Sequence, residues 1–541
     1  MIRTIQNLMT DNINCVYVVR LFFLIILISS CSHNVNKKDT INKKPNIVFI
    51  LADDLGAHDL SFTGSNFYET PNIDAIAENG VEFTQGYAAC QVCSPSRASL
   101  MTGQDPARHG ITDWIGAASG QKWADYYNTK IMPPDYQHAI ADSTITIAEA
   151  LKANGYKTFF AGKWHLGDEP FTPENNGFDI NKGGWEVGGP KGGYYAPWRN
   201  PKLNYLFEGE NLTKRLAYET VEFISANKDE PFFAYLSFYA VHGPIETTES
   251  KWEKYRDKAE AQGIQKSGFK MEARLPIRTV QDNPIYAGLV ESMDDAVGIV
   301  LAKLRELGLE DNTIVVFTSD NGGVASGDAF STTNYPLRGG KGYQWEGGIR
   351  EPYFIKVPML KNTPKNIDYP VSGIDFYPTL LDLVGIETNP NHVVDGVSLV
   401  PLLRGGSLTP RPLFWHYPHY GNQGGDPVSI IRKEEYKLIH YWEDRHDELF
   451  DLSSDPSEAK DISAEKPQLT QKLRSELDTY LSNLNATTPV VYENYDDDKA
   501  KAKYEDRKTK MKQRLEKQRM DFLREDFKPN EDWYNSALIK D

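Results

Sequence analysis

Several apolar runs in the first 400 residues end in polar side chains that suit chemistry. NIVFILADD ends in Asp53 and Asp54, the run IVVFTSDNGG contains Asp320 and Asn321, and PFFAYLSFYAVHGP contains His242. Short continuous apolar runs bounded by turn residues are typical of strands that are buried on both faces of a parallel sheet. The pattern therefore predicts three buried strands. The strand in PFFAYLSFYAVHGP is expected to end at His242.

Helical spacing separates these runs. TIAEALKANGYKTFFAGKWHLG reads as a helix that stops at Gly155 and is followed by a strand, and YAGLVESMDDAVGIVLAKLRELG has a helical period and leads into the strand at Ile314. Strands that alternate with helices indicate an α/β fold with a large, mainly parallel sheet flanked by helices. In such sheets ligands bind beyond the carboxyl ends of the strands, where the polar residues lie.

The pattern of apolar, polar and turn residues changes towards the C-terminus. After about Gly405, short alternating runs separated by turn residues predict an antiparallel sheet in a smaller C-terminal subdomain. Beyond about Glu493 the chain is strongly charged, which favours a solvated helix with pairs of opposite charge.

The amino-acid composition narrows the range of functions that the protein can have. The chain has 541 residues, enough for one large catalytic unit with a smaller companion. Its 59 lysines and arginines against 75 acidic residues give a net charge of −16. This balance argues against a nucleic-acid binder, so an anionic substrate must be attracted by a local basic pocket.

The N-terminus predicts export. The apolar stretch LFFLIILISSC is short, ends in small residues before Cys31, and resembles a bacterial lipobox, with an ordinary signal peptide as the alternative. We expect lipidation of Cys31, a membrane anchor, and location as an outer-membrane lipoprotein or in the periplasm. The expected organisation is a signal peptide with lipobox (1–31), a polar tether (32–44), a catalytic domain (45–404), a C-terminal subdomain (405–492) and a charged helical extension (493–541).

The stretch CQVCSPSRASLMTG allows three interpretations. A structural zinc site needs a second pair of cysteines or histidines at similar spacing, and no other cysteine pair exists. A redox pair is typical of a small thioredoxin-like unit, which does not surround Cys90 and Cys93. The third interpretation is a modified nucleophile.

CSPSRASLMTG resembles the signature of the formylglycine-dependent (type I) sulfatases of the alkaline phosphatase superfamily. In that signature, cysteine followed by proline two positions on and arginine four positions on directs oxidation of the cysteine to an aldehyde. The motif selects Cys93, because Cys90 has Val92 where proline is required. Other motifs of the family recur in order between Pro45 and Glu458: ILADDLG, GKWHLG, VHGP, SDNGG, LRGGKGYQWEGGIR and HDELFDLSSDPSEAKDI.

The resemblance implies an alkaline phosphatase-like fold and a metal site. Asp53, Asp54, Asp320 and Asn321 offer oxygen ligands, and with an oxygen of the modified Cys93 they suit Ca²⁺, with Mg²⁺ as the alternative. The alternative for isolated acidic pairs is helix capping or turn formation.

The resemblance also implies catalytic roles. Arg97 and Lys163 would hold the modified residue, Lys163 and Lys341 would contact sulfate, His242 would protonate the leaving alcohol, and His165 would assist release of the bound sulfate. Histidine suits proton transfer near neutral pH. A histidine that caps a strand and a solvated lysine in a glycine loop are the structural alternatives.

Two aromatic stretches are candidates for the walls of the substrate-binding pocket. GGWEVGGPKGGYYAPWRNP, with Lys191 and Arg199, could form a loop that stacks on sugars and binds anions, and FWHYPHYGNQGG, around His416 and His419, could close the other side of the pocket. Packing between subdomains is the alternative.

The expected function is hydrolysis of sulfate esters on oligosaccharides from a sulfated polysaccharide, such as algal ulvan, carrageenan or fucan. The expected partner is a formylglycine-generating or anaerobic sulfatase-maturating enzyme. Two alternatives are a phosphodiesterase or phosphonate hydrolase of the same superfamily and a non-catalytic glycan-binding lipoprotein.

Overall fold

The computed structural model describes residues 43–527 and 537–539. The predicted export signal, Cys31 and all but the end of the tether lie outside the described residues. The fold below is that of the unit formed by residues 44–541. Among the described helices, none combines the length and the apolar character needed to cross a bilayer.

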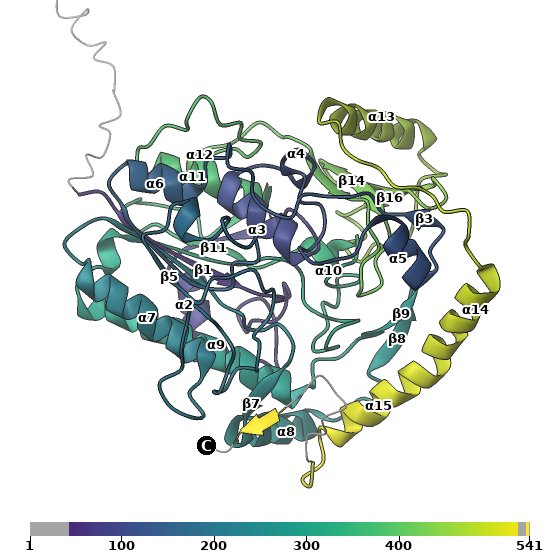
Figure 1. The fold of residues 1–541 in the computed structure, drawn as a ribbon, viewed down its shortest axis with the longest axis horizontal. Coiled ribbons are helices and arrows are strands. Elements are labelled where there is room, and N and C mark those ends of the chain that lie inside the picture. The colour runs from purple at the N-terminus through teal and green to yellow at the C-terminus, as the bar shows by residue number, and fades with distance from the viewer. Residues whose placement is uncertain (1–42, 528–536, 540–541) are drawn as a thin grey trace, which may run out of the picture. The chain divides into compact units, whose positions relative to one another are not determined.

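An eight-stranded sheet forms the centre of this unit (Figure 1), with the order β12-β2-β11-β10-β1-β6-β4-β5. The strands are β1 (Asn46–Ala52), β2 (Val81–Tyr87), β4 (Lys157–Gly162), β5 (Ile180–Lys182), β6 (Phe232–Ser237), β10 (Thr313–Ser319), β11 (Tyr353–Lys356) and β12 (Asn366–Ser372). Only β11 runs antiparallel to its neighbours, β10 and β2, and all other pairs are parallel. The predicted mainly parallel α/β sheet is confirmed.

Helices cover both faces of this sheet, which is why its strands are apolar throughout. Along β1, Val48 and Ile50 belong to one core and Phe49 and Leu51 to the other. The first face is covered by α2 (Pro71–Glu78), α7 (Leu212–Ala226) and α9 (Pro284–Glu306), and the second by α3 (Cys93–Thr102), α6 (Ile147–Ala153) and α11 (Phe376–Leu383).

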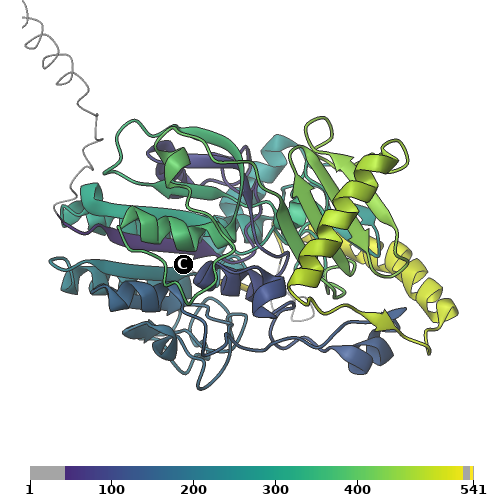
Figure 2. The same cartoon turned by 90° about the horizontal axis from the view of Figure 1, so that it is seen from above.

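A smaller antiparallel sheet follows, as predicted (Figure 2). It has the order β13 (Leu413–Tyr417), β14 (Val428–Lys433), β15 (Tyr436–Tyr441) and β16 (Asp447–Asp451). One face packs on α13 (Pro467–Asn483) through residues such as Leu438 and Leu477. The other face packs on the part of the fold around the large sheet through Trp415 and Tyr87, whose ring centroids are 5.3 Å apart.

The remaining elements are short or peripheral. They are β3 (Ile131–Met132) with β17 (Val490–Val491), β7 (Glu246–Thr248) with β18 (Ala537–Ile539), the hairpin β8 (Phe269–Glu272) and β9 (Leu275–Arg278), and the helices α4 (Pro106–His109), α5 (Gly120–Tyr127), α8 (Glu249–Gln262), α10 (Glu346–Ile349) and α12 (Val400–Leu403), with 3₁₀ turns at Glu174–Asn176, Glu310–Asn312 and Gly373–Asp375.

The charged C-terminal segment is helical but not wholly solvated. It forms α14 (Asp497–Asp506), a π-helical turn (Arg507–Met511) and α15 (Lys512–Asp521). The expected pairs of opposite charge are present, for example Lys501 with Asp497. The expectation of a solvated helix is wrong for α15, where Arg519 is 2% exposed and its Nε donates to Asp282 at 2.7 Å.

One predicted strand end is also wrong. β6 stops at Ser237, five residues before His242. The chain continues beside the end of β1 through single backbone bonds, from Asp53 N–H to the Ala240 carbonyl at 2.9 Å and from Val241 N–H to the Asp53 carbonyl at 2.7 Å. His242 is therefore held next to Asp53 and Asp54 by a loop rather than by a strand.

Candidate active site

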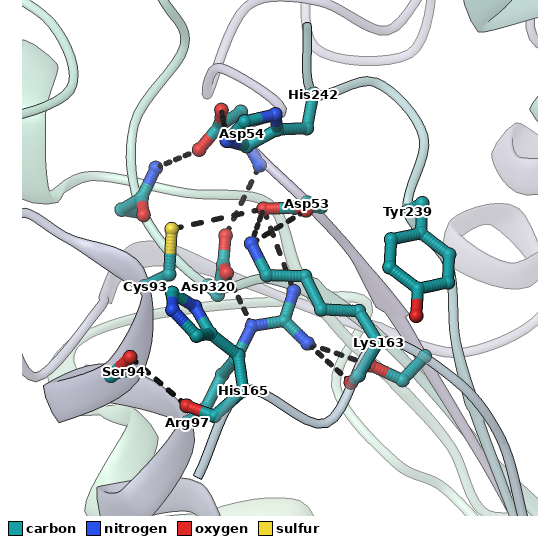
Figure 3. A network of polar contacts seen from close by, with 12 residues as sticks. Asp53, Asp54, Cys93, Ser94, Arg97, Lys163, His165, Tyr239, His242 and Asp320 are labelled. Atoms are coloured by element: carbon teal, nitrogen blue, oxygen red, sulfur yellow. Dashed lines mark hydrogen bonds and ion pairs between the residues drawn. The ribbon is translucent and has the colours of Figure 1, made fainter. Parts of the chain in front are cut away.

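The polar residues that follow the parallel strands meet at one edge of the sheet (Figure 3). Asp53 and Asp54 follow β1, and Asp320 follows β10, whose last residue Ser319 pairs with Ala52. Lys163 follows β4. Because these strands are parallel and in register, their carboxyl ends bring the side chains together, as the sequence predicted.

Cys93 is the first residue of α3, and all ten residues of that helix are buried. A helix N-terminus carries partial positive charge, which favours negative charge at this position. The Cys93 Sγ lies 4.0 Å from Asp53 Oδ1. Burial raises the pKa of the Cys93 thiol to about 12, so the unmodified side chain is a neutral thiol in this setting. Cys90, also a free cysteine, packs against Val92 and Tyr417.

Arg97 lies one turn further along α3 and links the strand ends. Its Nε donates to Asp320 Oδ2 at 2.7 Å, and its Nη1 donates to the Lys163 carbonyl at 3.0 Å and to Ser237 Oγ at 2.7 Å. Its Nη2 lies 3.5 Å from Asp53 Oδ1. A planar guanidinium suits this role because its donors diverge in fixed directions.

Two lysines neutralise the aspartates. Lys163 Nζ donates to both oxygens of Asp53, at 2.8 and 2.7 Å, and Lys341 Nζ donates to Asp54 Oδ2 at 2.8 Å. Burial, with Asp320 and Asp54 nearby, raises the pKa of Asp53 even though Lys163 lowers it. Burial also acts to raise the pKa of Asp54, but Lys341 and the other nearby cations hold it well below its usual value.

The residues fit a hard divalent cation. Among the described residues, Asp53, Asp54 and Cys93 form a group whose candidate ligand atoms lie within 4.8 Å of one another. Asn321 Nδ2 donates to Asp54 Oδ1 at 2.8 Å, while the buried Asn321 Oδ1 has no hydrogen-bond partner among the described residues. An unpaired buried oxygen is costly, and a cation beside three carboxylates would satisfy it.

The two histidines face the same cluster from opposite loops. His165 Nε2 lies 2.9 Å from the Ile115 carbonyl and so carries the proton, which leaves the buried Nδ1 free to accept one. His242 Nδ1 lies 2.6 Å from the Gly243 carbonyl, and its Nε2 lies 3.7 Å from Asp54 Oδ2. Burial lowers the pKa of both rings, that of His242 to about 4, so both are neutral at neutral pH.

Two of these residues adopt a strained backbone. Asp54 has φ 66° and His165 has φ 57°, in the left-handed region that non-glycine residues seldom occupy. Such conformations cost about 1–3 kcal/mol each and persist where surrounding contacts impose them, often at functional sites. Apolar patterns in the sequence carry no signal of this strain.

A cavity of about 510 Å³ opens above the cluster. Cys93, His165, His242 and Lys341 line its base. Its upper wall comes from four loops and includes Trp114, Ile115, Glu186, Val187, Lys191, Asp328, Asn422 and Gln423. The 186–191 loop passes close to the histidines: a Cβ at Gly188 would lie 2.5 Å from His165 Cε1, so glycine is required there.

The structure separates the three residues predicted to bind substrate. Lys191 lines the cavity, as expected. Arg199 is exposed and is not among the cavity residues. His416 is 2% exposed inside the small sheet, with ring nitrogens 2.7 Å from Ser429 Oγ and 2.8 Å from the Thr487 carbonyl. The expectation that His416 faces the pocket is wrong, because its position on β13 turns the side chain into packing.

The stretch around His416 still closes the pocket, but through other residues. Asn422 and Gln423, in its GNQGG turn, line the cavity, and Gln423 Nε2 donates to Asp328 Oδ2 at 2.6 Å. Asp328 in turn lies 3.7 Å from Lys341 Nζ. The glycines around Asn422 and Gln423 were the available signal for a turn at this place.

Known proteins resemble this chain over nearly all of the described fold. The Sulfatase family model matches residues 45–386, and a model for the C-terminal part of N-sulphoglucosamine sulphohydrolase matches residues 340–487. A sulfatase of Formosa agariphila is 32% identical, with 87% of this chain and 94% of that protein covered. The human N-acetylgalactosamine-6-sulfatase is 31% identical, with 74% and 72% covered.

Solved structures are also similar to this chain in fold. Ps i-CgsB in complex with k-i-k-neocarrahexaose is 28% identical, with a TM-score of 0.65 and 81% of this chain and 93% of that one covered. The phosphonate monoester hydrolase of Agrobacterium radiobacter, 20% identical with a TM-score of 0.54 and 83% and 100% covered, shares the fold alone. The sequence motifs, the strand-end cluster and these matches lead to one conclusion: the chain belongs to the sulfatase family of the alkaline phosphatase superfamily and is a sulfuric ester hydrolase.

Proposed function

We propose that this protein removes sulfate from oligosaccharides of a sulfated polysaccharide, such as algal ulvan, carrageenan or fucan, with a formylglycine made from Cys93. The observation that carries the proposal is the position of Cys93: it stands at the N-terminus of a buried helix, at the base of the cavity, beside Asp53 and within the ring of lysines and histidines. Pro95 and Arg97 complete its modification motif.

The carbohydrate substrate is supported by the relatives and by the cavity. One relative is an N-acetylgalactosamine-6-sulfatase, and one solved neighbour is in complex with k-i-k-neocarrahexaose. The cavity wall combines Trp114 with Lys191, Asp328 and Asn422. An aromatic face with a few polar groups is the usual lining of a site that orients a small ligand.

Asp53, Asp54, Asp320 and Asn321 would hold the cation, which we propose to be Ca²⁺ with Mg²⁺ as the alternative. When bound, it would supply positive charge to the sulfate oxygens and to the modified residue. Lys163 and Lys341 would then turn from Asp53 and Asp54 towards the sulfate. Arg97 would keep Asp53 and Asp320 in place, as it does in the present contacts.

A formylglycine at position 93, as its hydrate, would supply one hydroxyl oxygen as the nucleophile for sulfur and a second hydroxyl for the release of sulfate. Asp53, which lies 4.0 Å from the present Sγ, would accept the proton of the attacking hydroxyl. His242 would give a proton to the sugar oxygen as its bond to sulfur breaks. His165 Nδ1 would accept the proton of the second hydroxyl as sulfate leaves, and water would restore the hydrate. A serine could attack but could not eliminate sulfate in this way.

His242 must gain a proton before it can act as the acid. Burial and the Lys341 charge lower its pKa to about 4 without substrate. The negative charge of a sulfate ester beside the ring favours the protonated form, so we expect the pKa of His242 to rise when substrate binds.

Export and maturation complete the proposal. We infer lipidation at Cys31, an outer-membrane or periplasmic location, and modification of Cys93 by a formylglycine-generating or anaerobic sulfatase-maturating enzyme. Their support is the N-terminal sequence and the motif that begins at Cys93.

The test is a desulfation screen with protein made in a host that matures sulfatases. The panel holds defined oligosaccharides from ulvan, carrageenan, fucan and chondroitin sulfate, with a phosphonate monoester and a phosphodiester for the rival activity. We expect sulfate release from one glycan class and peptide masses that show the aldehyde at Cys93 and an intact thiol at Cys90. Cys93→Ser should fold but not turn over. Preferred hydrolysis of the phosphorus esters, or full activity with unmodified Cys93, would refute the proposal.

A further inference from the structure

A second groove adjoins the active-site cavity. Its volume is about 130 Å³, and it is lined by α5, the β8–β9 turn, the 420–424 turn and the C-terminal extension. Asn422 lines both hollows, and its buried Oδ1 has no hydrogen-bond partner among the described residues. Asn422 therefore lies between the two hollows, and a ligand that spans them would pass this side chain.

The C-terminal extension supplies one wall of this groove. It lies beyond residue 487, where the matched family models end. Several bonds hold it in place: Asn128 Nδ2 donates to the Asp496 carbonyl at 2.7 Å, and Glu516 accepts from the Gly268 and Phe269 N–H groups at 2.9 and 3.1 Å. In Figure 1, α14 runs past α5 and the β8–β9 hairpin. The wall is thus a docked part of the fold.

Three cationic side chains, Arg274, Lys503 and Arg507, line the groove. Arg274 pairs with Asp426 at 3.2 Å, whereas within the described part of the chain no ion pair joins Lys503 or Arg507 to a carboxylate. The neighbouring lysines on the same extension are paired, Lys501 with Asp497 at 2.5 Å and Lys510 with Asp506 at 2.9 Å. Among the described residues, Lys503 and Arg507 thus lack the carboxylate partners that Lys501 and Lys510 have.

Aromatic rings complete the lining. Trp123 and Tyr127 have ring centroids 4.0 Å apart, and Lys503 Nζ lies 5.4 Å from the Tyr127 ring. Arg274 stacks over Tyr420 at 4.7 Å. Arg274 Nη2 already donates to the Gly424 and Gly425 carbonyls, so the groove offers a ligand the Tyr127 ring beside the cations Lys503 and Arg507. This combination matches a sulfated sugar, which has an apolar ring face and an anionic group.

We propose that the C-terminal extension builds a distal subsite, at Lys503 and Arg507, for a second sulfate group on the same oligosaccharide whose first sulfate is removed at Cys93. The inference rests on the proposed function and deepens it: the enzyme prefers oligosaccharides sulfated on more than one unit. The volume suits a sulfate and the edge of a sugar rather than a buried ring.

The test compares two double variants with equal change of charge. Lys503→Gln with Arg507→Gln removes the groove cations, and Lys501→Gln with Lys510→Gln removes two paired, 71% and 82% exposed cations of the same extension. Binding is measured by calorimetry on Cys93→Ser protein with sulfated hexasaccharides from carrageenan, ulvan, fucan and chondroitin sulfate. Turnover of the mature enzyme is measured with 4-methylumbelliferyl sulfate, and unfolding temperatures verify folding.

We expect the groove variant to raise the Kd of the tightest-binding hexasaccharide about tenfold and to reduce its salt dependence. The control variant should change the Kd less than twofold, and both should hydrolyse the small aryl sulfate at the unaltered rate. Equal effects of the two variants, no effect of the groove variant, or failure of every hexasaccharide to bind would overturn the subsite. Absence of sulfatase activity in the mature enzyme without substitutions would instead refute the proposed function.

Discussion

Arg97 donates from Nε to Asp320 Oδ2 at 2.7 Å, and both side chains are almost fully shielded from solvent, at 3% and 0% exposed. The pair joins α3, the helix that begins at Cys93, to the end of β10. It therefore connects the position of Cys93 to the position of the proposed cation ligands, and a change at either residue should disturb both.

We expect Arg97→Lys to destabilise the fold as well as the chemistry. Lysine keeps the charge but cannot reach Asp320, Ser237 and the Lys163 carbonyl together, so the free energy of unfolding should fall by roughly 3 kcal/mol. Denaturant unfolding of unmodified protein separates this effect from failed maturation. Arg108→Lys, in the partly exposed pair with Asp395, is the control and should cost less than about 1 kcal/mol. Equal losses would contradict a special role for Arg97.

Removal of divalent cations should abolish activity and lower the unfolding temperature. Lys163 and Lys341 can partly neutralise Asp53 and Asp54, as their present contacts show, so the loss of stability should be moderate while the loss of turnover is complete. Chelation followed by addition of single metals measures both, and Ca²⁺ should restore both. Asn321→Ala should raise the Ca²⁺ concentration needed by roughly tenfold or more. Restoration by Zn²⁺ alone would count against an all-oxygen site.

Alanine substitutions at Lys191 and Arg199 should differ in their effect on substrate binding. Lys191 lines the cavity and Arg199 does not, although both belong to the same loop region. Lys191→Ala should raise KM for a sulfated oligosaccharide several-fold and leave kcat for a small aryl sulfate unaltered. Arg199→Ala, the matched control, should have little effect on either substrate. A larger effect of Arg199→Ala would show that the sugar approaches from another side.

His242→Ala should harm poor leaving groups most. A sugar hydroxyl needs a proton as it departs and an acidic phenol does not, so kcat should fall about 10²- to 10⁴-fold for the sugar sulfate and much less for an activated aryl sulfate. Steady-state kinetics on the two substrates provide the comparison. A uniform loss would assign His242 to binding instead of acid catalysis.

Glu246 should make stability depend on pH. It is 7% exposed, accepts from the Tyr194 N–H at 2.6 Å, and burial raises its pKa from 4.5 to about 7. Between these values the folded protein keeps a proton that the unfolded chain releases, so stability falls as pH rises from 4.5 to 7, by roughly 3 kcal/mol in total.

Glu246→Gln should remove this slope, because glutamine stays neutral and still offers an acceptor. The variant should gain stability over the unaltered protein at about pH 8 and not at about pH 4, as measured by denaturant unfolding. Glu208→Gln, at an exposed position, is the control. A pH-independent difference between Glu246→Gln and the unaltered protein would contradict the proposed titration.

The local pattern of residues in the sequence determined much of the fold and of the site of this protein. Apolar runs marked β1 and β10 because strands covered on both faces need no polar residues, and the parallel arrangement then required Asp53 and Asp320 to share one edge of the sheet. The motif around Cys93 distinguished it from Cys90 without any structure, because Pro95 and Arg97 have fixed spacings from it.

Only the tertiary structure decided which side chains outside the sequence motifs line the cavity. His416 and Asn422 belong to one aromatic stretch, yet one is packed inside the small sheet and the other lies between two hollows. Likewise, nothing in the charged C-terminal segment indicated that Lys503 and Arg507 would face a groove beside the active site. These positions depend on contacts between residues hundreds of positions apart, such as Asn128 with Asp496, and a local pattern of polarity holds no information about such contacts.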